Sequence, residues 1–410
     1  MEKTNKVPRL RFPGFTDDWE QRKLGELVQF SKGTGYSKSD LKNSGTPIIL
    51  YGRLYTKYET VISQVDTFAD AKKGSVYSHG GEVIVPASGE TAEDISIASV
   101  VEQPGVILGG DLNIITPPKE LDSAFLALCI SNGQPHSDMA KVAQGKTVVH
   151  LHNDDLKTVN LIYPKTAEQK QISQFFGAID NLITLHQRKL NAVKQHKTGM
   201  LQKMFPRDGD NVPEVRFPGF TDTWEQRKLG DVLTERNVQH PQSKEFPLVS
   251  FTVENGVTPK TDRYEREQLV KGDKAAKKYK ETHFNDIVYN PANLKFGAIA
   301  RNKYGNAVFS PIYVTYEVND ELALPSFVEM YVTRKSFIQN ALQYQQGTVY
   351  ERMAVNTDDF ANLEIMIPSK EEQSQIGKLF TSLDDFITLH QRKLDQMKQY
   401  KKGLLQQMFV

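Results

Sequence analysis

The chain has 410 residues, which is too many for one ordinary hydrophobic core and gives a prior of two or three domains. Its 39% hydrophobic and 25% charged residues are typical of a globular protein and exclude wholesale disorder. The net charge of +1 creates no overall positive field that would point to a nucleic acid, and Cys129, the single cysteine, excludes an internal disulfide. No apolar run is long enough for a membrane span or a signal core, so we expect a soluble protein of the cytoplasm.

The sequence repeats itself at half its length. Residues 11–25 read RFPGFTDDWEQRKLG, and residues 216–230 read RFPGFTDTWEQRKLG, which differs at one position of 15. A second block, ITLHQRKL, occupies residues 183–190 and returns unchanged at residues 387–394. This period is far longer than the roughly 20–50 residues of a solenoid repeat. The pattern therefore indicates duplication of a whole half, with shared assembly surfaces.

Between the matched blocks, each half contains a module that differs from its counterpart. Glycine and proline bound short apolar runs in both modules, which is typical of strands. The first module, residues 26–142, predicts strands at 46–51, 82–85 and 106–108 and a helix at 125–131. The second module, residues 231–344, predicts strands at 246–251, 286–289, 297–300 and 312–316 and a helix at 326–343.

After its module, each half continues in the same order. A glycine turn comes first, at residues 144–147 or 346–349. An aspartate pair and an apolar strand follow, and the strand ends at Pro164 or Pro368. The two halves are therefore expected to share a fold despite their unlike modules.

Basic residues are interleaved with tyrosine in both modules. Such clusters suit phosphate contacts combined with contacts to bases, although many surface lysine runs are only solvated faces. Two clusters in two modules favour the first interpretation. The candidate DNA contacts are Arg53, Tyr55, Lys57, Lys72 and Lys73 in the first module, and Lys274, Lys277, Lys278, Lys280, Lys295, Arg301 and Lys303 in the second.

Two long helices are predicted over residues 166–206 and 368–410. Apolar residues recur there at alternating steps of four and three, which is the pattern of a coiled-coil seam. A capping-box pattern opens each helix, at residues 166–169 and 369–372. One helix alone would leave its apolar stripe in water, so we expect the two to pack together. The predicted packing residues are Ile172, Phe176, Ile179, Ile183, Leu190, Ile376, Phe380, Leu383, Ile387 and Leu394.

Four polar residues interrupt this seam at equivalent places: His186, Lys197, His390 and Lys401. A buried polar seam residue costs stability but can fix the register of the helices and their choice of partner. The alternative is that these side chains reach solvent where the seam frays.

Three segments share part of an enzyme motif but lack the rest of it. Residues 145–147 lack the earlier glycine of a phosphate-binding loop, because position 140 is Ala140. Residues 30–35 lack the surroundings of a methyl-donor site, and residues 290–293 lack the second proline and final aromatic of an adenine-methylase tetrapeptide. No histidine lies at metal-ligand spacing from cysteine or carboxylate. We expect a binding protein with no catalytic residue, no metal site and no cofactor of its own.

Taken together, the chain resembles the specificity subunit of type I DNA restriction-modification systems over essentially its whole length. The resemblance rests on RFPGF-x-x-x-WEQRKLG at the start of each half and on the strand–turn runs at residues 81–89 and 285–290. It also rests on the QG-T turns, the Asp-Asp pairs before Leu156 and Phe360, and helices of the form EQ-x-QI…ITLHQRKL…LQ-x-MF.

This resemblance implies a mixed α/β (α+β) fold with pseudo-twofold duplicated halves. Two target recognition domains, residues 1–165 and 207–367, would be separated by two long antiparallel coiled-coil helices, residues 166–206 and 368–410. Each domain would read one half of a bipartite site in double-stranded DNA, with the helices as ruler and docking surface. The resemblance carries over contact residues only near the glycine turns, at Lys146, Thr147, Thr348 and Tyr350.

The same resemblance implies the partners and the location. Two methyltransferase subunits would bind this chain, and restriction subunits would complete the complex in the bacterial cytoplasm. S-adenosylmethionine, ATP and Mg²⁺ would be bound by those partner subunits. Two alternatives stay open on the residues alone: a stand-alone DNA methylase or nuclease with diverged motifs, and a coiled-coil scaffold that binds proteins.

Overall fold

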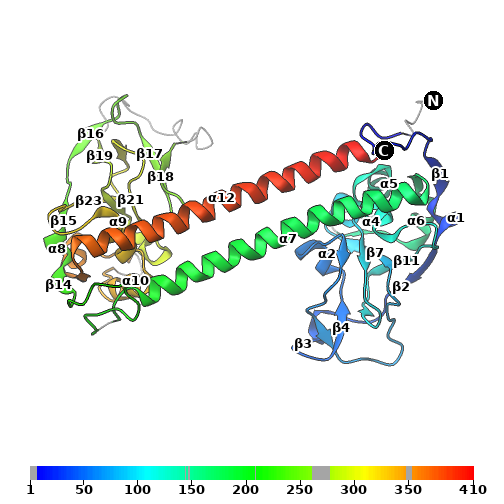
Figure 1. Ribbon diagram of the computed structural model, residues 1–410, viewed down its shortest axis with the longest axis horizontal. Coiled ribbons are helices and arrows are strands. Elements are labelled where there is room, and N and C mark those ends of the chain that lie inside the picture. The colour runs from blue at the N-terminus through cyan, green and yellow to red at the C-terminus, as the bar shows by residue number, and fades with distance from the viewer. Residues whose placement is uncertain (1–6, 144, 146–147, 208, 261–277, 348–352) are drawn as a thin grey trace. The chain divides into compact units, whose positions relative to one another are not determined.

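The computed structural model describes residues 7–143, 145, 148–207, 209–260, 278–347 and 353–410 (Figure 1). It contains two compact units: unit 1 comprises Met1–Arg188 and His390–Val410, and unit 2 comprises Lys189–Leu389. No helix in this described part of the chain combines the length and the apolarity that crossing a membrane requires.

Two helices are much longer than the other elements of the described chain. They confirm the prediction of a mixed α/β protein with two long helices. α7 (Thr166–Lys203) has 38 residues and α12 (Lys370–Met408) has 39. At about 1.5 Å per residue, each is close to 60 Å long. The units divide both helices, so each unit contains the first part of one helix and the last part of the other. The sequence instead predicts the helices as segments outside the globular domains.

The centre of unit 1 is a five-stranded sheet in the order β2-β11-β7-β9-β5. β7 (Glu82–Pro86) lies in the middle and is buried along its whole length. Val83 and Val85 face the main core and Ile84 faces a smaller core on the opposite side, as the alternation of a strand dictates. The other strands are β2 (Gln29–Lys32), β11 (Leu112–Thr116), β9 (Ser99–Val101) and β5 (Val61–Ile62).

Smaller elements surround this sheet. A second sheet of unit 1 has the order β10-β4-β6-β3. Its strands are β3 (Leu41–Lys42), β4 (Thr46–Ile49), β6 (Phe68–Ala69) and β10 (Ile107–Leu108). The remaining elements are β1 (Glu20–Lys23), α1 (Leu24–Leu27), η1 (Lys38–Asp40), α2 (Gly52–Thr56), β8 (Ser88–Gly89), α3 (Ala92–Ile95), α4 (Ser123–Asn132), α5 (Gln134–Val142), β12 (Val149–His150), α6 (Asn153–Thr158) and β13 (Asn160–Tyr163).

Unit 2 is built around a four-stranded sheet in the order β15-β23-β20-β21, with β20 (Ile287–Tyr289) fully buried. Tyr289 stacks on Phe360 with 4.5 Å between the ring centroids, and this contact joins the sheet to α11 (Thr357–Asn362). The other sheet strands are β15 (Leu233–Glu235), β23 (Val314–Val318) and β21 (Ile299–Arg301).

A three-stranded sheet and a hairpin complete the β-structure of the second module. The sheet has the order β16-β19-β22, and β17 pairs with β18. These strands are β16 (Gln239–Pro241), β17 (Val249–Thr252), β18 (Gly256–Pro259), β19 (Lys278–Thr282) and β22 (Ala307–Phe309). The remaining elements are β14 (Glu225–Lys228), α8 (Leu229–Val232), η4 (Pro291–Phe296), α9 (Pro325–Val332), α10 (Lys335–Leu342), α11 (Thr357–Asn362) and β24 (Glu364–Ile367).

The helix predicted over residues 326–343 is two helices, α9 and α10. Arg334 breaks it by adopting an extended conformation, with φ −66° and ψ 141°. Its guanidinium carbon lies 4.7 Å from the ring centroid of Phe205 and 4.0 Å from that of Tyr331. These cation–π contacts stabilise the break, and periodicity within the segment does not reveal them.

The duplicated segments form the same aromatic cluster in each unit. Phe125 in unit 1 lies 5.9 Å from Trp19 and 5.7 Å from Phe409, between ring centroids. In unit 2 the counterparts are Phe327, Trp224 and Phe205, with Phe205 5.8 Å from Trp224 and 5.6 Å from Phe327. The Trp of the WEQRKLG block and the Phe of the closing MF pair are thus core residues of one cluster.

A buried ion pair fastens each RFPGF block to the start of a long helix. The guanidinium of Arg11 donates two hydrogen bonds, of 2.7 and 2.8 Å, to Glu168 in the first turn of α7. Arg216 donates two, both 2.7 Å, to Glu372 in the first turn of α12. Both carboxylates are only 1% exposed. The sequence repeat therefore preserves a bidentate pair.

The next residue of each helix binds the main chain of its module. The side chain of Gln169 accepts the N–H of Asp122 and donates to the carbonyl of Pro164. Gln373 does the same with Leu324 and Pro368. Each glutamine is therefore fixed between its module and the strand that precedes its helix.

Within each unit the two helix parts run antiparallel, and the polar seam residues have defined partners. In unit 1, Lys401 donates to Asp180 at 2.5 Å, and the rings of His186 and His390 lie 5.7 Å apart. In unit 2, Lys197 pairs with Asp384. The apolar packing residues are buried at Ile172, Phe176, Leu190, Ile376, Phe380 and Leu394, and partly buried at Ile179, Ile183, Leu383 and Ile387.

Removing one side of the buried ion pair should be costly. Arg216→Ala leaves the carboxylate of Glu372 buried without its cation, and we expect a loss of about 3–5 kcal/mol in the free energy of unfolding of unit 2. Arg227→Ala, which removes an exposed pair with Glu225, should cost less than about 1 kcal/mol. Urea denaturation followed by circular dichroism measures both. Equal losses in the two variants would contradict the prediction.

The thiol of Cys129 can report whether the core of unit 1 is intact, because it is buried there. Burial raises the pKa of its thiol to about 12, so the folded chain should resist alkylation at pH 8. Phe409→Ala opens a cavity in the core that contains Cys129 and should destabilise unit 1 by about 3–5 kcal/mol.

Iodoacetamide labelling of Cys129 should therefore be faster in Phe409→Ala than in the wild type. Phe205→Ala removes the equivalent ring from unit 2 and is the matched control, in which Cys129 should stay protected. The prediction is wrong if both variants are labelled at the same rate.

Candidate nucleic-acid interface

In unit 1 the strand that follows the glycine turn lies against the segment that follows the central strand β7. β12, just after the turn, pairs antiparallel with β8, so that His150 opposes Ser88. Gly145 has φ +137°, and a Cβ there would lie 1.9 Å from the carbonyl oxygen of Val148, so only glycine fits. The candidates Lys146 and Thr147 lie outside the described residues.

In unit 2 the described residues on either side of the corresponding turn pair with each other and reach the segment that follows β20. Gln346 and Ala354 exchange main-chain hydrogen bonds of 2.9 and 3.0 Å. Beyond them, Val355 donates its N–H to the carbonyl of Pro291 at 3.4 Å. The candidates Thr348 and Tyr350 lie outside the described residues. The two units therefore bring the residues that follow these turns to equivalent ends of their sheets.

Arg53 is not available to a ligand, and its prediction as a DNA contact is wrong. The residue is 8% exposed. Its guanidinium pairs with Asp66, donates to Glu59 at 2.8 Å and to the carbonyl of Gln64 at 2.9 Å. Two carboxylates neutralise it, so it holds the loop after α2 together.

Tyr55 and Lys57, from the same segment, remain at the surface. Tyr55 is 37% exposed and donates its hydroxyl to the carbonyl of Ser88 at 2.7 Å. Burial of this hydroxyl raises its pKa well above the usual value. Tyr55 therefore lies beside β8, whereas Lys57 pairs with Asp66 at 2.8 Å.

Lys72 and Lys73 differ although they are neighbours in sequence. Lys72 pairs with Asp40 at 2.6 Å and lies 4.6 Å from the ring centroid of Tyr36. Lys73 is exposed and has no carboxylate partner among the described residues. Only Lys73 of this pair presents an uncompensated charge.

Lys280 is buried, so its prediction as a DNA contact is also wrong. It is 5% exposed, and its ammonium donates to Glu235 and to Asn237, both at 2.8 Å. Lys278, two residues earlier on β19, is exposed and has no carboxylate partner within the described ranges. The candidates Lys274 and Lys277 lie outside those ranges.

Arg301 and Lys303 converge on one carboxylate instead of forming a free basic patch. Arg301 donates to Glu329 at 3.0 Å and to the side chain of Asn285 at 2.8 Å. Lys303 reaches the other oxygen of Glu329, also at 3.0 Å. The two cations share one anion, so a single net positive charge remains.

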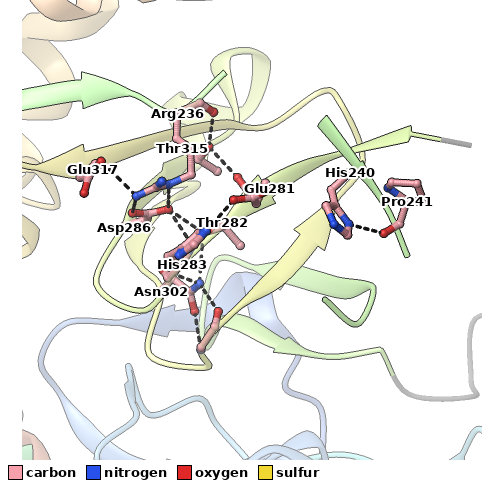
Figure 2. Close-up of polar contacts among 11 residues, drawn as sticks. Arg236, His240, Pro241, Glu281, Thr282, His283, Asp286, Asn302, Thr315 and Glu317 are labelled. Carbon is pink, nitrogen blue, oxygen red and sulfur yellow. Dashed lines mark hydrogen bonds and ion pairs between the residues drawn. The ribbon is translucent and has the colours of Figure 1, made fainter. Parts of the chain in front are cut away.

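A buried polar network supports the strand that carries Lys278 and Lys280 (Figure 2). Asp286 is 2% exposed and accepts a hydrogen bond from Arg236 at 2.9 Å and from the N–H of His283 at 2.7 Å. Burial raises the pKa of Asp286, although Arg236 acts in the opposite direction. The hydroxyl of Thr315 bonds to the carbonyls of Arg236 and Glu281, which joins β15, β19 and β23.

Asn302 fixes the turns at the end of this network. Its side chain donates to the carbonyl of His283 at 2.8 Å (Figure 2). It also donates to the carbonyl of Gly305 at 2.7 Å and accepts the N–H of Tyr304. Phe284 and Tyr304 are 59% and 42% exposed on these turns. The aromatic side chains are therefore presented by rigid backbone.

Sequence reasoning missed an open hollow of about 310 Å³ between the β17–β18 hairpin and η4. It contains no basic run, and its parts lie up to about sixty residues apart in sequence. Lys295, on η4, is the predicted residue nearest to it in sequence: its ammonium lies 4.9 Å from the ring centroid of Phe296. The lining residues include Phe251, Val253, Asn290, Asn293, Phe296 and Tyr313.

The described part of the chain contains no group of three or more His, Cys, Asp or Glu side chains that could hold a metal ion.

Comparison with known proteins finds the same family twice in this chain. The model of the family described as "Type I restriction modification DNA specificity domain" matches residues 16–195 and 221–399. The type I restriction enzyme MjaVIII specificity subunit of Methanocaldococcus jannaschii is 20% identical, over 97% of this chain and 92% of that protein. A second sequence from this organism, named as the MjaX specificity subunit, is also 20% identical, over 95% and 92%.

Solved structures share the fold. The type I restriction-modification S subunit from M. genitalium has a TM-score of 0.62 at 12% identity, covering 98% of this chain and 99% of that one. A chain from a structure described as the basis of "complex assembly and conformational transition of the type I R-M system" has a TM-score of 0.54 at 14% identity, covering 97% and 98%. The resemblance seen in the sequence is confirmed by the family match over most of the chain: this protein belongs to the family of type I restriction modification DNA specificity domains.

Proposed function

We propose that the chain is the DNA specificity subunit of a type I restriction-modification complex. Each unit reads one half of a bipartite site in double-stranded DNA. The observation that carries this proposal is the double match of the family model, once for each half of a chain whose modules differ. Because the two modules differ while the segments around them are duplicated, each module can recognise a different half-site.

Methylation and cleavage belong to the partners in this proposal. Two methyltransferase subunits and the restriction subunits bind S-adenosylmethionine, ATP and Mg²⁺, and this chain selects the sequence in the bacterial cytoplasm. The names of the two relatives as specificity subunits support this division of roles. One of the similar solved structures is described as a study of how a type I system assembles, which supports the presence of partner subunits.

Few of the candidate lysines and arginines on the described surface are unpaired, which suits a DNA-binding protein that makes few phosphate contacts. Lys73, Lys278 and Lys295 are exposed and lack carboxylate partners among the residues described, whereas most other candidate cations are paired. Phosphate contacts position a protein on DNA, and contacts to base edges supply the sequence preference. The near-neutral chain therefore depends on its partners for much of the nonspecific attraction.

Methylome sequencing tests the proposed function. Deleting the gene should erase one split adenine-methylation motif from the genome, and an unchanged methylome would refute the proposal. Replacing residues 26–142 with the module of a relative should change one half of that motif only. The reciprocal control replaces residues 231–344 and should change the other half; a change in both halves after either exchange would contradict independent reading.

The ion pairs predict which lysines contribute to the salt dependence of DNA binding. Lys73→Ala and Lys295→Ala should each reduce the slope of log K against log salt by about 0.9 if each contacts one phosphate. Lys57→Ala and Lys72→Ala are the matched controls, because each of these lysines is already paired with a carboxylate, Asp66 or Asp40. Fluorescence anisotropy over a salt series measures the slopes, and identical slopes in all four variants would contradict the assignment.

A further inference from the structure

We propose that the hollow beside η4 is a base-reading pocket, in which the amide of Asn293 reads an adenine and the apolar rim contacts the thymine paired with it. This inference rests on the proposed function and adds to it one site, one base pair and the residues that recognise it. The pocket belongs to unit 2 and therefore to one half-site.

The hollow is open and large enough to receive the exposed edge of a base pair. Its volume, about 310 Å³, lies near the lower end of the range of roughly 300–1,000 Å³ that small-molecule sites occupy. Phe251, Phe296 and Tyr313 contribute aromatic rings, and Asn290 and Asn293 contribute amides. The hollow therefore combines apolar surface with a few polar groups, which is the usual composition of a binding site.

Large apolar side chains are exposed around this hollow. Phe296 is 64% exposed, Val253 is 54% exposed, and Ile312, next to the lining residue Tyr313, is 58% exposed. Single exposed apolar residues are common, but several around one hollow mark a contact surface. The methyl group of thymine, which projects into the major groove, is an apolar partner of fitting size.

The two asparagines of the segment have different roles. Asn290 is 5% exposed, and its oxygen accepts the N–H of Ala292 at 3.1 Å. Asn293 is exposed, and its side chain makes no hydrogen bond within the described part of the chain. Asn290 therefore fixes the wall, and Asn293 offers both a donor and an acceptor to a ligand.

An asparagine amide matches adenine better than the other bases. Its donor and acceptor can bond at the same time to N7 and N6 of adenine in the major groove. An apolar protein segment would be the alternative occupant, but it would leave the amide of Asn293 without a partner. Lys295, whose ammonium has no carboxylate partner in the described residues, adds a contact that suits a neighbouring phosphate.

The pocket is held by rigid structure at the end of the module where the glycine turn lies. Leu294 is completely buried in the main core of unit 2, which anchors the middle of η4. Gly297 ends η4 with φ +82°, a conformation that glycine adopts without strain. Val355, just after the glycine turn, is bonded to both Pro291 and Tyr289. A site on such fixed elements can discriminate between bases because its groups cannot rearrange to fit another base.

The test uses the full chain co-expressed with its methyltransferase subunits and a pool of DNA duplexes with randomised positions. Asn293→Ala should reduce the preference for adenine at one position of one half-site by roughly 5- to 150-fold and leave the other positions unchanged. Asn293→Asp should shift that position toward cytosine, because a carboxylate accepts from the cytosine amino group. Phe296→Ala should weaken the preference at the same base pair.

Asn306→Ala is the matched control. Asn306 is an exposed asparagine in the turn that follows β21, whereas η4 precedes this strand, so its removal should leave the selected sequence unchanged. Two results would overturn the proposal. One is an unchanged preference in the Asn293 variants, with or without loss of methyltransferase from the purified complex; the other is a uniform loss of binding at every position. Failure of the wild-type complex to select any bipartite site would instead refute the proposed function itself.

Discussion

The buried pairs of Arg11 with Glu168 and of Arg216 with Glu372 are the contacts on which each unit depends. A carboxylate that is 1% exposed is stable in its charged form only with its cation and hydrogen bonds in place. The pair joins the RFPGF block to a helix more than 150 residues away in sequence. This requirement explains why both blocks are retained in duplicate while the modules between them differ.

The contacts that join each module to this frame explain how the modules can differ. Gln169 and Gln373 bind main-chain N–H groups, those of Asp122 and Leu324, which every residue except proline provides. Each aromatic cluster takes one ring from its module at the equivalent place, Phe125 or Phe327. Because the duplicated segments contact few side chains of each module, most of the module sequence can vary and can determine which DNA sequence is bound.

Sequence patterns predicted the parts of the fold that local periodicity encodes. Both long helices and several strands, such as β4 and β7, follow from spacing and turn residues. Arg53 and Lys280 were assigned wrongly because their partners, Asp66 and Glu235, approach them only in the folded chain. The hollow beside η4 was invisible for the same reason, since β17 and η4 are separate in sequence. A run of basic residues in the sequence shows only that positive charges are present. The folded structure shows which of them are paired with carboxylates and which are not.

The division of the long helices also sets an order in which the units can be completed during synthesis. All of unit 2 lies within one continuous stretch, Lys189–Leu389, whereas unit 1 requires His390–Val410 in addition to its earlier residues. Until Phe409 emerges, the rings of Phe125 and Phe176 that contact it remain uncovered in the nascent chain. Domains generally fold as their residues become available, so the half that is translated first is expected to finish folding last. During that interval unit 1 is the part of the molecule that depends on protection from aggregation.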